Sequence, residues 1–283
     1  VFLENKVVTG DITLAGGNLL QGFSNGLSAR DSLLVCSAKV TGGLTISGKH
    51  CVVKGIEFTS TADKAIQFSG SPQNVTFEDC VFDMAGHNRW FYGDGLGGTV
   101  VIKNCWVKNE GVDPLWNWFT ADFSTDSSAT PAQKLDSVTV DQCYFDGITG
   151  NIVARGIQAD PNGVVRYTDN KFRYDNQSAL LWAVLEANNT QEVVCTGNVV
   201  TGVTKVAGGE LTLLQTWARS GAWRLTFQNN SMDSLNFVVQ IPGSATFYNP
   251  THATSVVENG TGVVTNADYG ASFTYPFTGG TYA

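Results

Sequence analysis

Charged residues, basic residues and long apolar runs are all scarce in this chain of 283 residues. Only 15% of the residues are charged, and 17 Lys and Arg against 25 Asp and Glu leave a net charge of −8. Phosphate binding needs a basic face, so we expect no nucleic-acid partner. No apolar run reaches the roughly 18 residues that a spanning helix needs, so we expect no membrane span.

The residues that usually mark catalytic and metal sites are also few. The three histidines, His50, His87 and His252, are scattered, and His87 beside Arg89 is only a weak candidate for acid–base work. No Ser–His–Asp arrangement is legible, and the cysteines lack the short paired spacing of a zinc site. We therefore expect no metal and no cofactor.

What the chain does contain is a repeat, and the stretch NVTFEDCVFD at residues 74–83 is its clearest copy. It reads as two short alternating strands with a bend at Glu78 and Asp79. Aligned copies begin at Cys51, Val75, Val100, Val138, Val165, Val193 and Leu225. Their sixth positions are Ile56, Cys80, Cys105, Cys143, Asn170, Asn198 and Asn230, spaced by 24, 25, 38, 27, 28 and 32 residues. Seven copies predict a stacked array in which each unit buries its face on its neighbours.

A repeat of about 25 residues with short strands and no helical stretch predicts a coil of parallel strands. Stacking at strand spacing would place Cys on Cys, and Asn170, Asn198 and Asn230 in a hydrogen-bonded amide ladder. From about residue 45 to 241 the pattern resembles the right-handed parallel β-helices of the pectate-lyase-like superfamily, which also includes bacteriophage tailspikes. We therefore expect an all-β fold, a right-handed single-stranded parallel β-helix or solenoid, with terminal caps and one long loop insertion.

Three segments follow from this pattern. Residues 1–44 would form an N-terminal cap and first irregular rungs, with either a short helix or irregular rungs at 18–20 and 33–35. Residues 45–241 would form the β-helix, and residues 242–283 a C-terminal cap or a segment that contacts a partner. The 38-residue step predicts a loop at residues 111–134 that leaves the coil, and loops carry function more often than scaffolds do.

The polar columns of the repeat alternate in charge. The fourth position reads Lys54, Glu78, Lys103, Asp141, and the ninth reads Asp83, Lys108, Asp146, Arg173. Opposite charges stacked at strand spacing attract, so we interpret both columns as exposed charge ladders that hold register rather than as catalytic groups.

A second polar column precedes the sixth position by 12 to 15 residues and reads Gln67, Gln158, Glu186, Gln215 and Gln240. It predicts a second strand in each rung, with these side chains on one face. The rungs that end at Cys105 and Cys143 lack this signal and carry residues 87–98 and 111–134 instead.

All six cysteines are interpreted as small buried hydrophobes, because five fall in inward columns. A core of free thiols suggests folding in a reducing compartment. The thiols favour assembly in a bacterial cytoplasm, and the tailspike resemblance implies a final place on a virion surface, with secretion as the alternative.

Candidate binding residues are aromatic or basic and lie in the long loop or beside the second column: Trp116, Trp118, Trp182, Trp217 and Arg219. Aromatic faces beside carboxylates and amides suit sugar rings. The alternative is that these rings cover the flank of the coil. The acids that remain as weak catalytic candidates are Asp122, Asp126 and Glu186, and a glycosidase would need two of them to converge.

The leading functional hypothesis is a virion-type structural and binding protein: a tailspike, fibre or capsid decoration that contacts a cell-surface polysaccharide. The tailspike resemblance implies a homotrimer that also touches other virion proteins. The alternatives are a polysaccharide lyase or glycoside hydrolase of the same fold, and a rod without a ligand, because fold does not determine function.

Overall fold

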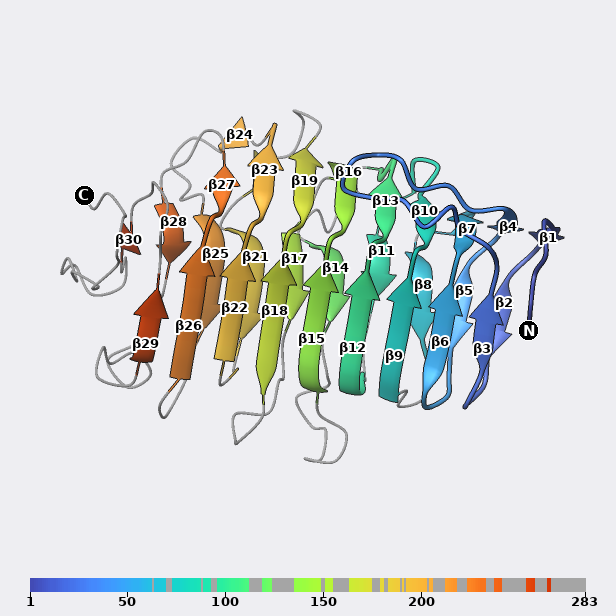
Figure 1. The fold of residues 1–283 in the computed structure, drawn as a ribbon, viewed down its shortest axis with the longest axis horizontal. Helices are drawn as coiled ribbons and strands as arrows, with labels where there is room; N and C mark the ends of the chain where they lie inside the picture. Colours follow the sequence, from blue (N-terminus) through green and yellow to red (C-terminus); the bar gives the residue numbers. More distant parts are fainter. Residues whose placement is uncertain are drawn as a thin grey trace.

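The computed structural model describes residues 1–62, 64–69, 73–87, 89–92, 96–111, 119–123, 135–148, 151–154, 163–174, 179–180, 183–188, 190, 192–202, 204–205, 212–217, 223–232, 237–240, 253–257 and 264–265. In these residues the chain winds into a coil of short strands, with β1 (Val7–Thr9) and β30 (Val264–Thr265) at opposite ends (Figure 1). No helix occurs among the described residues.

Three long sheets run the length of the coil, and each strand pairs in parallel with the strands of the preceding and following turns. Sheet A contains β3 (Leu19–Gln21), β6 (Cys51–Lys54), β9 (Gln73–Glu78), β12 (Gly97–Lys103), β15 (Leu135–Asp141), β18 (Val164–Thr168), β22 (Glu192–Thr196), β26 (Trp223–Gln228) and β29 (Ala253–Val257). Sheet B contains β1 (Val7–Thr9), β4 (Ala38–Thr41), β7 (Ile56–Thr59), β10 (Val81–Asp83), β13 (Trp106–Lys108), β16 (Tyr144–Ile148), β19 (Lys171–Tyr174), β23 (Val199–Thr201) and β27 (Ser231–Met232). Sheet C contains β2 (Ile12–Leu14), β5 (Leu44–Ile46), β8 (Lys64–Phe68), β11 (Arg89–Tyr92), β14 (Phe119–Phe123), β17 (Asn151–Ala154), β21 (Ala183–Asn188), β25 (Thr212–Trp217), β28 (Phe237–Gln240) and β30 (Val264–Thr265).

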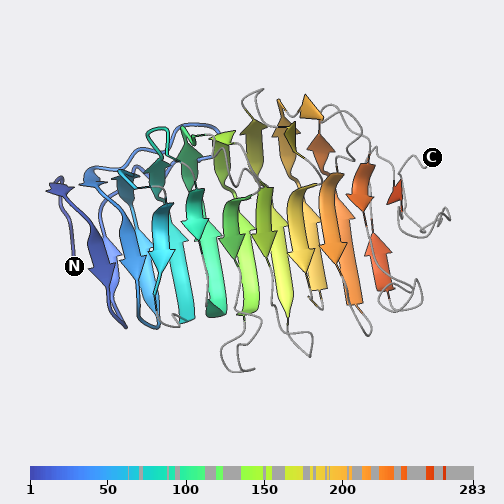
Figure 2. The ribbon, with the colours of Figure 1, turned by 180° about the vertical axis from the view of Figure 1, so that it is seen from behind.

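One rung is one turn of the coil, made of a strand from sheet B, then one from sheet C, then one from sheet A. The first rung is β1–β3, the second β4–β6, and the order holds along the coil, with a small side sheet of β20 (Ala179–Leu180) and β24 (Thr204–Lys205). Figure 2 shows the coil from the side of sheet C. The fold is therefore the predicted all-β parallel β-helix, a solenoid.

The predicted repeat register is confirmed in sheet A. The first positions of all seven copies pair in one line: Cys51, Val75, Val100, Val138, Val165, Val193 and Leu225. Val100 pairs with Val138 across the 38-residue step, so the extra residues do not shift the ladder. The prediction of one loop leaving the coil at residues 111–134 is wrong at residues 119–123, which form β14 of sheet C. Residues 112–118 and 124–134 lie outside the described residues.

The interior is filled by inward columns from all three sheets. Rings stack from rung to rung, as in Phe58 on Phe82 at 5.4 Å and Phe145 on Phe172 at 5.0 Å between ring centroids. Trp90 is fully buried among these rings. Stacking at this spacing keeps the apolar rings of successive rungs in contact with each other rather than with water.

The A–B corner is the turn that joins a sheet A strand to the sheet B strand of the next rung. Its first residue has φ between 48° and 66° in every copy: Gly55, Asp79, Asn104, Gln142, Asp169, Gly197 and Asn229. Glycine, asparagine and aspartate tolerate this left-handed conformation best, which explains the composition of the fifth position of the repeat.

The second residue of the corner points inward and forms the predicted ladder. The Asn170 amide donates to Asn198 Oδ1 at 3.0 Å, and the Asn198 amide donates to Asn230 Oδ1 at 2.9 Å. Cys80, Cys105, Cys143 and Cys195 are fully buried and free, as predicted. The amide ladder therefore continues a column of thiols along the same edge of the core.

The charge ladders are confirmed where they are described. Lys54 lies 3.0 Å from Glu78 in the fourth column, and Lys108 lies 3.7 Å from Asp83 in the ninth. Arg173 contacts Asp146 one rung away.

The first 44 residues contain strands in register with the second rung, so the coil already runs through them. The short-helix alternative is wrong: residues 19–21 form β3, and residues 33–35 belong to a strap. We define the strap as residues 23–36, which leave the coil after β3 and return at β4. In Figure 1 the strap runs along the upper edge of the coil past β10 and β13.

Candidate functional site

One line of residues follows the outward side of sheet C along most of the coil. We call it the sheet C column; the pairing of the strands places in it Thr13, Thr45, Gln67, Tyr92, Asp122, Val153, Glu186, Gln215, Gln240 and Thr265. In the adjacent line, Ile66, Phe91 and Leu185 are fully buried. Since side chains alternate along a strand, the sheet C column lies on the opposite face.

The predicted polar column is confirmed for Gln67, Glu186, Gln215 and Gln240, which share this line. Two parts of that prediction are wrong. Strands β11 and β14 supply Tyr92 and Asp122, so the fourth and fifth rungs do not lack the second strand. Val153 occupies the position beside Glu186 that Gln158 was expected to hold, and Gln158 itself lies outside the described residues.

The sequence carried a usable signal for one of these missed residues. Tyr92 precedes Cys105 by 13 residues, which is within the interval found for the other rungs. Asp122 precedes Cys143 by 21 residues and Val153 precedes Asn170 by 17, because longer connections separate their strands from sheet A. A fixed interval can therefore find Tyr92 but not the other two.

The end of the column near the N-terminus combines an aromatic ring with two cations. Lys64 and Arg89 pair in register on β8 and β11. Lys64 Nζ lies 3.8 Å from the centre of the Tyr92 ring, and Arg89 Cζ lies 5.4 Å from it. Both distances are within the range of cation–π attraction. Gln67 is exposed beside this group.

The same contacts decide the role of the weak His87–Arg89 candidate. Arg89 faces Tyr92, whereas the backbone of His87 closes the turn after β10, donating to Met84 O at 2.8 Å and accepting from the Gly111 amide at 2.7 Å. Arg89 therefore belongs to the sheet C site and His87 to a turn on another side of the rung.

Farther along the column lie two of the three candidate acids. Asp122 and Glu186 are separated in the column by Val153 alone, so about 9.5 Å, two strand spacings, separates their backbones. Glu186 is only 4% exposed, and its backbone carbonyl accepts a 2.8 Å hydrogen bond from the buried Tyr167 hydroxyl. The core thus anchors the strand that carries Glu186.

The remaining predicted site residues are mostly outside the described part of the chain. This applies to Trp116, Trp118, Asp126, Trp182 and Arg219. Trp217 is the last residue of β25 and pairs with Asn188, two positions beyond Gln215 in the same strand. It is the one predicted binding residue that the strand pairing places next to the sheet C column.

Metal ligands and membrane-spanning segments are the remaining features to place. Across the described residues no group of three or more His, Cys, Asp or Glu side chains is arranged to hold a metal ion. None of the described segments is a helix long and apolar enough to cross a membrane.

Known proteins offer few matches to this chain. No protein-family model matches the chain, and no curated protein matches it by sequence. Among solved structures, the chain is similar to a PL6-family alginate lyase, with a TM-score of 0.38 and 12% sequence identity. That match covers 100% of this chain and 50% of the lyase, so the chain spans half the length of the protein it resembles.

Proposed function

We propose that the protein binds a polysaccharide chain along the sheet C column. The observation that carries this proposal is the continuous strand register from Gln67 to Gln240, in which every position except Val153 is polar or aromatic. Six strand spacings separate these two residues, which corresponds to about 29 Å. A straight line of that length suits an extended polymer better than a small molecule.

The chemistry of the column also favours a sugar polymer. Amide and carboxylate groups hydrogen-bond hydroxyls, and an aromatic ring offers an apolar face to a sugar ring. Lys64 and Arg89 beside Tyr92 add donors at one end. The three kinds of group occur together on sheet C.

A binding test uses Tyr92→Ala and an array of bacterial surface polysaccharides. We expect the variant to lose affinity about tenfold for any glycan that the natural protein binds, because an aromatic anchor carries much of the energy of such a contact. Thr76→Ala, on the outward side of sheet A, is the matched control and should bind normally. Equal binding by both variants would place the glycan elsewhere.

An enzyme of the same fold is the second candidate, and the positions of Asp122 and Glu186 favour it. Inverting glycosidases hold two carboxyl groups about 6.5–9.5 Å apart, on either side of the sugar and a water molecule. One acid would protonate the leaving oxygen while the other activates the water. In this reading Asp122→Asn and Glu186→Gln should each abolish the release of reducing ends from a bound glycan. Unchanged release in either variant would exclude the pair.

We also propose that the protein is a virion-type structural part, a tailspike, fibre or capsid decoration on a virion surface, which assembles as a homotrimer with other virion proteins. The six buried free cysteines support folding in a reducing compartment such as a bacterial cytoplasm. Light scattering tests the assembly, since three chains of 30.3 kDa give about 91 kDa. A mass of one chain would contradict the trimer and shift the balance toward the enzyme or a secreted protein.

A further inference from the structure

The strap is a closed loop at an A–B corner, and the later corners of the described coil contain only one or two residues. Its neck is joined by an antiparallel bridge between Ser24 and Cys36 and by the Ser37 amide, which donates to Phe23 O at 2.8 Å. Within the strap the Asn25 side chain accepts from the Leu27 and Val35 amides and donates to Leu33 O. The strap is therefore a unit with its own internal bonds.

The first docking point of the strap is Asn104, in the corner between the fourth and fifth rungs. Asn104 Oδ1 accepts from the Ala29 amide at 2.7 Å, and its Nδ2 donates to Leu27 O at 3.1 Å. Beside it, Ala29, Leu34 and Cys36 form an apolar cluster with Val81, against which Trp106 packs. These contacts fix the strap on rungs that lie two and three turns beyond its own.

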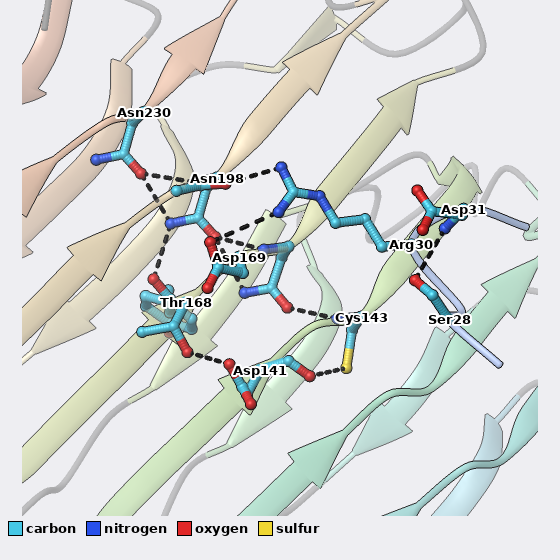
Figure 3. A network of polar contacts seen from close by, with 12 residues as sticks. Ser28, Arg30, Asp31, Asp141, Cys143, Thr168, Asp169, Asn198 and Asn230 are labelled. Atoms are coloured by element: carbon cyan, nitrogen blue, oxygen red, sulfur yellow. Dashed lines mark hydrogen bonds and ion pairs between the residues drawn. The ribbon is translucent and has the colours of Figure 1, made fainter. Parts of the chain in front are cut away.

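The second docking point is still farther along the coil. Arg30 donates from Nη2 to Gly197 O at 3.2 Å, and its Nη1 lies 3.5 Å from Asp169 Oδ1. Figure 3 shows the guanidinium of Arg30 reaching the corners of Asp169 and Asn198 from the strap. Asp169 lies between the sixth and seventh rungs and Gly197 between the seventh and eighth.

We propose that the strap is a clasp that couples the opening of the first rungs to the opening of the seventh and eighth. In a solenoid each rung contacts only its neighbours, so stability at one end is normally independent of stability at the other. The strap bypasses this rule, because it leaves the coil after the first rung and binds 167 residues farther along the chain. Such coupling is reciprocal, so loosening either end must loosen the other.

Hydrogen exchange read by mass spectrometry tests the clasp in the full chain. Asp169→Asn keeps the size and left-handed backbone of the corner but removes the charge that Arg30 contacts. We expect the strap amides, Ala29 and Leu33 among them, to exchange about two- to fivefold faster, the effect of a half-exposed ion pair. Asp146→Asn is the matched control, because it removes the Arg173 pair between neighbouring rungs and should leave strap exchange unchanged.

A second pair of variants tests the coupling in the other direction. Asn104→Gly keeps the φ of 48° accessible while deleting both strap bonds, so we expect strap exchange to rise about tenfold. The distant amides of Asp169 and Val199, bonded to Thr196 O and Asn170 O, should also exchange faster. Gln142→Gly, in the same corner column, is the control and should move neither group. The proposed coupling is wrong if Asn104→Gly speeds strap exchange while the Asp169 and Val199 amides stay protected. It is also wrong if Gln142→Gly speeds exchange as much as Asn104→Gly does.

Discussion

At the scale of single residues, the asparagines of the A–B corner form buried hydrogen bonds that join successive rungs. Asn198 donates to Tyr167 O at 2.8 Å and to Asn230, and its Oδ1 accepts from the backbone and side-chain amides of Asn170. It is fully buried, so every one of these groups would otherwise lie unpaired in the core. A short side chain with both donors and an acceptor suits this position.

Replacing Asn198 by Ala is therefore expected to be costly. The change removes the side-chain partner of Tyr167 O and of the Asn170 backbone and side-chain amides, while Asn230 Oδ1 keeps its bond from the residue 198 backbone amide. We therefore expect a loss of about 3 kcal/mol or more in the free energy of unfolding, measured with urea. Asn18→Ala is the control, since Asn18 is exposed and its side-chain amide donates to the nearby Ala15 O. A loss below about 1 kcal/mol at Asn198 would contradict the ladder's energetic role.

At the scale of strands, stacked charges set how neighbouring rungs align. Lys54 lies 3.0 Å from Glu78 and 3.7 Å from Asp79, and the hydrogen bond that Lys54 donates to the Glu78 carboxylate raises the pKa of Lys54. Lys103 follows in the same column on the next strand. Each pair is partly exposed, so its value lies in specifying register more than in stability.

Glu78→Lys tests this ladder, because it stacks three lysines in consecutive strands. We expect a loss of about 1 kcal/mol in the free energy of unfolding at low salt, reduced at high salt as the repulsion is screened. Urea denaturation at two salt concentrations measures it. The double variant Lys54→Glu with Glu78→Lys restores opposite charges at positions 54 and 78 and should recover part of the loss. No recovery would show that packing, rather than charge, was disturbed.

The sheet C strands also include site residues that the sequence did not predict. The sheet A strands could be predicted because each lies at a fixed distance in sequence from its A–B corner. The connection from each sheet C strand to the following sheet A strand varies in length, so no fixed distance locates the sheet C strands. Tyr92 kept the usual interval but was passed over because it is neither Gln nor Glu. Asp122 and Val153 did not keep the interval, and their place in the column follows from strand pairing alone.

At the scale of the whole molecule, the buried thiols link stability to pH. Burial raises the pKa of Cys105 and of Cys195 above the ordinary value of 9.0, and it does the same for Cys36, the last residue of the strap. In the folded chain these thiols stay protonated at a pH where the unfolded chain has already lost the protons. The unfolded state is therefore favoured as pH rises past the unfolded pKa.

We expect the free energy of unfolding to be steady up to about pH 8 and to fall above about pH 9. The slope is up to about 1.4 kcal/mol per pH unit for each thiol that must remain protonated. Urea midpoints at pH 7.5 and 9.5 in the presence of a reductant measure it. Cys195→Ala should show a shallower fall than the natural chain. A midpoint that does not fall over this range would mean that the thiols titrate in the folded coil.

The sequence by itself determined the repeating part of this protein: the stacked rungs, their register, the inward thiols and amides, and the alternating charges. These follow from short-range alternation and from steps that can be counted, since each rung repeats the same demand for burial. Tertiary structure alone decided which residues from separate rungs meet. The sheet C column brings Tyr92 beside Lys64 and Arg89, and the strap brings Arg30 to Gly197. Those contacts depend on how connections of unequal length cross the coil, and no local pattern in the chain records that path.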